Sequence, residues 1–236
     1  MRKETKSTEI KKNMKDDNFQ ELENMLSKER FATYLAEMGG NRQDAIRLYI
    51  WNTAVGASFY GPLQALEIAL RNQIHAKLSE KYGIQWYGEQ SDIKFNDKNR
   101  EQLDMTEARL GKKKFSTDPP GVVADLSFGF WVILLSSHYT NLWHPMLYKV
   151  FPHAAPATRR NIHEQLQILL DLRNKIAHHR PIFRMGEKTG KNLSDYHQDI
   201  LKTIGWMSPR KKEWVEMYSR VEEILARNPK APDLHF

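Results

Sequence analysis

Apolar residues recur at helical spacing along most of this chain. Between Ser27 and Gly39 they fall at i, i+3 and i+4, which predicts a short helix that Ser27 caps. A second helix is expected to begin after Asn41 and to lead into a long segment over residues 58–82 that Gly83 ends. The first third of the chain is therefore predicted to be helical.

Proline positions and unbroken apolar runs divide the middle of the chain. Pro62 is expected to lie in a first helical turn or to cause a kink. Residues 96–112 have a polar helical pattern, and residues 112–121, with two prolines, predict a loop. Residues 122–135 are apolar on all sides, which predicts one buried helix, with a buried strand as the alternative because the run is rich in β-branched and aromatic residues.

The last third of the chain again has helical periodicity. A long helix is predicted over residues 157–179, closed by Pro181, and two more over residues 194–205 and 209–227. Strand–turn–strand signals are almost absent and no repeat runs through the sequence. The pattern predicts an all-α fold.

The domain organisation follows from where this periodicity begins. Residues 1–18 are polar and rich in charge, which predicts a flexible basic arm. Residues 19–236 are predicted to form a single helical domain.

Composition excludes several kinds of protein. The 236 residues include no cysteine, so a disulfide framework, a cysteine zinc site and thiolate catalysis are excluded. The longest apolar run, residues 128–135, is far shorter than the roughly 20 residues needed to cross a bilayer. The charged N-terminus has no signal-peptide pattern, so we expect a cytoplasmic protein with no membrane contact.

The net charge of +7 and the pI of about 9.4 favour an anionic partner, and nucleic acid is the commonest one. Each basic cluster alone is more typical of a solvated helix end or loop. The clusters are Lys11-Lys12, Lys112-Lys113-Lys114, Arg159-Arg160 and Arg210-Lys211-Lys212.

The segment RNKIAHH, residues 173–179, is the candidate chemical site. On a regular helix Arg173 and His178 differ by about 140° in azimuth and about 7.5 Å in height. They can share one site only if the arginine swings round at a distorted helix end, or if two copies of the motif meet across a dimer. Asn174 lies one turn from His178, where its amide could hold the imidazole.

These residue types suit metal-independent cleavage of RNA. Histidine exchanges protons near neutral pH, and arginine presents a planar fork to a phosphate. Two copies would supply an acid and a base. The alternative is ordinary helix-end chemistry, since cations are favoured near a helix C-terminus.

The segment R-N-K-I-A-H fits the R-x4-6-H motif of HEPN ribonuclease domains, including the polar residue after the arginine. Its surroundings resemble successive blocks of Abi-like proteins of the AbiD/AbiF type, which are bacterial abortive-infection factors. The resemblance covers roughly residues 25–185, and its blocks are LSKERFATYL (26–35), residues 45–78, SFGFW (127–131) and LRNKIAHHRPIF (172–183).

This resemblance implies a HEPN-like helical bundle with additional N- and C-terminal helices. It implies an endoribonuclease toxin of an anti-phage abortive-infection (toxin–antitoxin) system, often a homodimer and in some relatives restrained by a small structured RNA. Arg173, Asn174 and His178 match the motif, with His179 as a second histidine in the R-x5-H register. The partner is RNA, and no metal or cofactor is expected.

Further cleft candidates surround the motif. Glu67 and Arg71 are spaced for an ion pair within one helix, but they could instead project towards the cleft. Lys175 and Arg180 are candidate RNA contacts. Arg180 occupies the position where HEPN toxins inhibited by nucleotidylation carry tyrosine, so we expect an RNA or protein inhibitor.

The other constellations favour structural roles. Arg71-Asn72 and His75 echo the motif with one residue too few, which we interpret as chance. The scattered histidines lack metal-ligand spacing, and Trp214, like three other tryptophans, fits a core or interface anchor better than a base-stacking platform. Two other functions stay open: a catalytically inactive HEPN RNA-binding module and a helical interaction scaffold.

Overall fold

The computed structural model describes residues 21, 23–88, 91–111, 119–187 and 190–230. The predictions for residues 1–18 and for most of the loop at 112–121 lie outside this part of the chain. The described residues form helices and turns with no strand, which confirms the all-α fold class. None of the helices in these ranges has both the length and the apolar character to span a bilayer.

The chain falls into two compact units, Met1–Ser58 with Arg220–Phe236, and Phe59–Ser219. The division lies inside one continuous helix, α4 (Arg42–Tyr82). The single domain predicted over residues 19–236 stays a prediction.

The first unit contains α3 (Lys28–Glu37), the first part of α4 and α13 (Val221–Leu225). Ser27 caps α3 as predicted, since its hydroxyl accepts the Arg30 N–H at 3.4 Å. The Trp51 indole N–H donates to the Arg227 carbonyl at 3.0 Å, so this contact joins segments far apart in sequence.

Helix α4 begins and ends where the sequence predicts. The Asn41 side chain accepts the Asp44 N–H at 3.1 Å, and Gly83, at a φ of 81°, follows the last turn. Pro62 lies inside the helix, so the first-turn position is wrong. Because proline has no N–H, the Ser58 carbonyl four residues earlier loses its ordinary helical donor.

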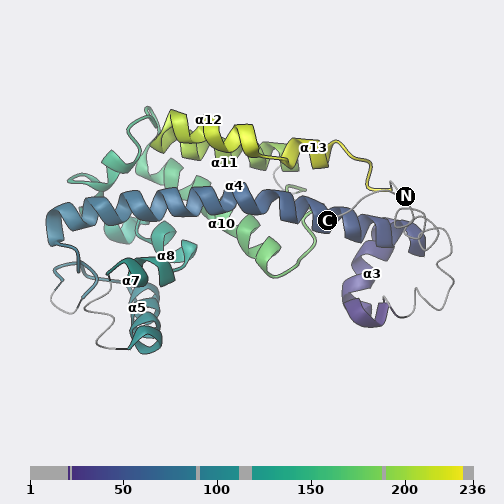
Figure 1. Cartoon of the computed structure of the whole chain (residues 1–236), viewed down its shortest axis with the longest axis horizontal. Helices are drawn as coiled ribbons and strands as arrows, with labels where there is room; N and C mark the ends of the chain where they lie inside the picture. The colour runs from purple at the N-terminus through teal and green to yellow at the C-terminus, as the bar shows by residue number, and fades with distance from the viewer. Residues whose placement is uncertain (1–20, 22, 89–90, 112–118, 188–189, 231–236) are drawn as a thin grey trace, which may run out of the picture. The chain divides into compact units, whose positions relative to one another are not determined.

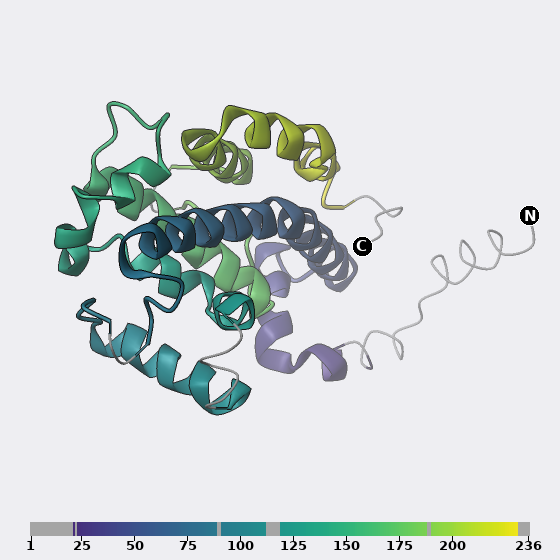
Figure 2. The same ribbon diagram turned by 60° about the vertical axis from the view of Figure 1, so that its left-hand side comes forward.

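The second unit surrounds the rest of α4. Its helices include α5 (Asp97–Leu110), α7 (Pro119–Asp125), α8 (Phe128–Ile133), α9 (Thr140–Trp143), α10 (Arg159–Ala177), α11 (Leu193–Met207) and α12 (Pro209–Tyr218), with short 3-10 turns at Ser137–Tyr139 and Leu147–Val150. Helix α10 packs against α8 and α11, and α11 packs against α12. Figures 1 and 2 show α5 and α12 on opposite sides of α4.

Two predicted helices are each divided in the structure. The apolar run over 122–135 forms α7 and α8, because Ser127 between them accepts the Phe130 N–H at 3.3 Å and starts a new helix. The predicted helix over 209–227 is interrupted at Ser219, which has an extended backbone. The prolines assigned to a loop begin α7.

Aromatic side chains fill the centre of the second unit. Trp86 is fully buried, and its ring centroid lies 5.3 Å from Tyr87 and 5.9 Å from Trp131. Its indole N–H donates to Nδ1 of His75 at 2.9 Å, so the polar atom of the buried ring is satisfied. This bond ties the end of α4 to the core.

A buried polar network joins α5 to α8. Asn99 is fully buried; its amide donates to the Phe130 carbonyl at 3.2 Å and its Oδ1 accepts the Tyr139 hydroxyl at 2.8 Å. The same hydroxyl accepts the Asn96 N–H at 2.9 Å. The Asn99 Oδ1 and the Asn96 N–H therefore both depend on the Tyr139 hydroxyl for these hydrogen bonds.

Removing that hydroxyl is expected to destabilise the protein. Tyr139→Phe leaves the Asn99 Oδ1 and the Asn96 N–H each without this partner, at a cost of about 1–3 kcal/mol in the free energy of unfolding. Urea denaturation followed by circular dichroism measures the change. The control Tyr148→Phe alters an exposed tyrosine, and equal stability of the two variants would contradict the network.

Candidate functional site

Helix α10 carries the RNKIAHH segment and is fixed at its start by a capping box. The Thr158 hydroxyl accepts the Asn161 N–H, and the Asn161 side chain accepts the Thr158 N–H, both at 3.2 Å. One stripe of the helix is buried, at Ile162, Leu166, Leu169 and Leu172. Burial of this stripe fixes the directions in which the side chains of the following residues point.

The helix ends inside the candidate motif, in a Schellman arrangement. The Arg180 N–H donates to the Lys175 carbonyl at 2.8 Å and the His179 N–H donates to the Ile176 carbonyl at 3.0 Å. His178 is the C-cap, and His179 has a left-handed φ of 54°. Helix α10 therefore ends at Ala177, two residues before the predicted end at residue 179 and four residues before Pro181.

Both histidines at this end are exposed. Within the described part of the chain, neither imidazole has a hydrogen bond or an ion pair. The Asn174 amide, which was expected to hold His178, instead accepts a hydrogen bond from the Arg173 guanidinium at 3.4 Å. Both rings are therefore accessible for proton exchange.

Arg173 faces α4. Its Nε lies 3.9 Å from a carboxylate oxygen of Glu67, and its side chain keeps 39% of its surface exposed. Glu67 thus contacts the motif across two helices, as the cleft alternative expects. No ion pair between Glu67 and Arg71 is formed among the described residues, and the buried Nε of Arg71 has no hydrogen-bond acceptor there.

Two opposing effects act on the pKa of the Glu67 carboxyl. Burial raises its pKa above the ordinary value, while the positive charges of Arg173 and Arg71 lower it in part. Because the net shift is upward, Glu67 contributes stability at acidic pH, and this is lost as the pH rises through the raised pKa. Two arginines and one such carboxyl give this group of residues a net positive charge.

The two remaining cleft candidates differ in their surroundings. The Lys175 ammonium lies 3.1 Å from Asp171 and 2.9 Å from the Met185 sulfur, so it is already engaged. Arg180 is exposed. Sequence reasoning missed Asp171, although its i, i+4 spacing to Lys175 is an ordinary ion-pair signal; nothing local indicated Met185.

The second motif-like set has a structural role. Nδ1 of His75 accepts the Trp86 hydrogen bond, and burial lowers the pKa of His75. Across the described residues, no three His, Asp or Glu side chains gather as a metal site.

The geometry joins Arg173, Asn174 and Glu67 but leaves the histidines apart from them. Helix α10 is regular to Ala177, so the azimuth of about 140° between Arg173 and His178 holds. No contact links these two side chains in the described chain.

Comparisons with known proteins find no matching family model and no significant match among curated proteins or solved structures. A proposed function therefore rests on the residues of the candidate site.

The contact between Arg173 and Glu67 can be tested by titration. In Arg173→Ala the pKa of Glu67 is expected to rise further, because the larger of two stabilising positive charges is lost. Carboxyl carbon NMR measures this pKa. Arg160→Ala, which removes an exposed arginine from the same helix, is expected to leave it unchanged, and an unchanged pKa in both variants would mean that Arg173 and Glu67 are not neighbours.

Proposed function

We propose that this protein is a metal-independent endoribonuclease of the HEPN type. One observation carries the proposal: two exposed histidines, which have no partner among the described residues, end the same helix whose Arg173 meets Glu67 of α4. Proton-transfer groups and an anion-binding group thus occur within one short segment. The net charge of +7 supports an anionic substrate.

The proposed reaction is transfer within the RNA backbone. A base removes the proton from a 2′-hydroxyl, and its oxygen forms a bond to the adjacent phosphorus. The bond from phosphorus to the 5′-oxygen breaks, and an acid gives that oxygen a proton. The products are a 2′,3′-cyclic phosphate and a 5′-hydroxyl.

Each residue has a distinct role in this scheme. His178 exchanges the proton, with His179 as the second candidate. Arg173 binds the phosphate oxygens as negative charge builds on them. Asn174 and Glu67 position the guanidinium through the contacts of 3.4 Å and 3.9 Å, and Arg71 adds positive charge to the same cleft.

We expect the complete site to form between two copies of the chain. Within one copy, Arg173 and His178 leave α10 in directions about 140° apart. A symmetric dimer would place the histidines of one copy opposite the arginine of the other, and two copies would provide an acid and a base.

The biological role is proposed from the resemblance to abortive-infection proteins. Cleavage of RNA in an infected bacterium would halt growth and phage production. Such an enzyme needs restraint, and Arg180 at the position of a modifiable tyrosine favours an RNA or protein antitoxin, of which the resemblance suggests a small structured RNA. The substrate would be met in the cytoplasm.

The proposal is tested by RNA cleavage in the presence of EDTA. The purified protein is expected to generate 2′,3′-cyclic phosphate ends. Arg173→Ala and His178→Ala are expected to lower the rate by at least about a hundredfold, since proton transfer by a positioned group contributes about 10²–10⁴-fold. Gel analysis of end-labelled RNA measures the rates.

Matched controls separate chemistry from folding. Arg160→Ala and His144→Ala change exposed residues of the same types and are expected to retain activity. Circular dichroism verifies that each variant is folded. RNA binding without turnover would identify a catalytically inactive RNA-binding module, and cleavage that survives both site variants would overturn the assignment.

A further inference from the structure

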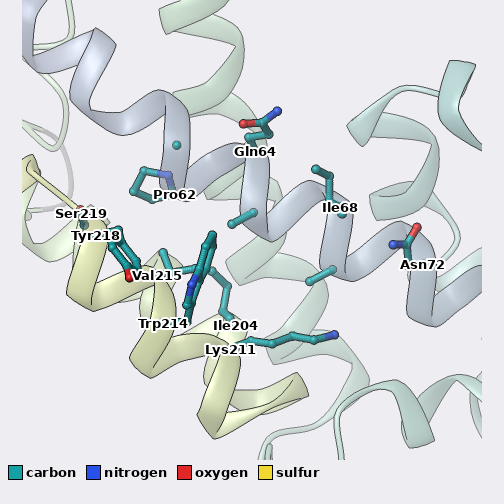
Figure 3. Close-up of a pocket in the computed structure, with 13 residues that line it drawn as sticks. Pro62, Gln64, Ile68, Asn72, Ile204, Lys211, Trp214, Val215, Tyr218 and Ser219 are labelled. Carbon is teal, nitrogen blue, oxygen red and sulfur yellow. The ribbon is translucent and has the colours of Figure 1, made fainter.

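An open groove lies between α4 and α12 in the second unit (Figure 3). Its volume of about 560 Å³ is within the range of about 300–1,000 Å³ common for ligand pockets. The α4 wall includes Pro62, Ile68 and Asn72, and the α12 wall includes Lys211, Trp214 and Tyr218. None of these residues belongs to the site around Arg173.

Two aromatic side chains on the α12 wall are exposed. Trp214 and Tyr218 are 61% and 68% exposed, and their ring centroids are 5.5 Å apart with an angle of 55° between the planes. Trp214 is thus no core anchor, which corrects one of its two expected roles. Because the rings are tilted, they leave the faces of the indole available to a flat ligand.

The groove also has a free cation. Lys211 is the charged residue among its described lining, and it forms no ion pair within the described chain. The neighbouring Lys212, by contrast, lies 3.8 Å from Glu216. In Figure 3 the Lys211 side chain extends along the groove on the side where Asn72 lies.

We infer that this groove binds an unstacked base of single-stranded RNA, with Trp214 stacking on the base and Lys211 contacting a flanking phosphate. Aromatic faces combined with cations are how proteins hold single strands without reading sequence. The Asn72 amide adds a donor and an acceptor for a base edge. The choice of RNA rests on the proposed function.

A purely apolar partner fits the groove less well. A hydrophobic helix covering the groove would take the Lys211 ammonium out of water without giving it a counter-charge, which is unfavourable. A phosphate supplies that charge. The net charge of +7 also favours a polyanion over another copy of the same chain.

The groove and the Arg173 site use neighbouring faces of α4. Ile68 lines the groove and the preceding residue, Glu67, contacts Arg173. One turn later Asn72 lines the groove, and the charge of the preceding residue, Arg71, acts on Glu67. Adjacent helix residues differ by about 100° in azimuth and 1.5 Å in height. The groove and the Arg173 site therefore lie on adjoining faces of the same stretch of α4.

Binding is measured in a His178→Ala background, so that the probe is not consumed. The probe is a fluorescein-labelled single-stranded RNA of about twelve nucleotides, followed by anisotropy. Trp214→Ala is expected to raise the Kd about five- to a hundredfold, as expected for one lost base stack, while Trp214→Phe retains most of the affinity. Lys211→Ala is expected to reduce the slope of log K against log salt concentration by about 0.7.

Met217→Ala is the matched control. Met217 is on the same helix and is 75% exposed, but it does not line the groove. Equal Kd values for Trp214→Ala and Met217→Ala would overturn the inference. A second outcome would also overturn it: sedimentation shows that the wild type is a dimer and that Trp214→Ala is a monomer, while the affinity for RNA is unchanged. The groove would then be an interface between copies of the chain.

Cleavage by protein with His178 intact separates this inference from the proposed function. If Trp214→Ala weakens RNA binding while His178→Ala leaves cleavage unchanged, the groove assignment stands and the catalytic one fails. If His178→Ala abolishes cleavage and Trp214→Ala leaves the Kd unchanged, the catalytic assignment stands and the groove assignment fails.

Discussion

Burial of one apolar stripe on α10 determines where the candidate catalytic side chains lie. Leu166, Leu169 and Leu172 are completely buried, so the rotation of the helix about its axis is fixed. Arg173 then leaves the helix beside the buried face and meets Glu67, whereas His178 leaves on the solvent side. The same packing that stabilises the bundle therefore separates Arg173 from His178 within one chain.

The elements that sequence predicts well are those whose ends are set by local chemistry. Ser27, Asn41 and Gly83 lie where a cap or a left-handed stop is required, and the structure places helix ends there. The division of residues 122–135 into two helices was harder to predict, because the apolar pattern continues across a serine that begins a new helix. Ser127 caps only because the chain turns there to pack α8 against α10, which is a tertiary effect.

The candidate site could likewise be predicted only in part from the sequence. Spacing alone identified Arg173, Asn174 and His178, since these residues are close in sequence. The partner of Arg173 is more than a hundred positions away, so spacing could offer Glu67 only as one of two alternatives. The exposure of Trp214 was hidden for the same reason: a tryptophan at helical spacing resembles a core residue until the neighbouring helix is placed.

The backbone at His179 has a consequence for the stability of the fold. A left-handed residue ends α10, and glycine is the residue that adopts this conformation without steric cost. Histidine there forgoes roughly 1 kcal/mol of folding free energy. Glycine at this position would fit the backbone better, so the residue that exposes an imidazole at the end of α10 also lowers the stability of the fold.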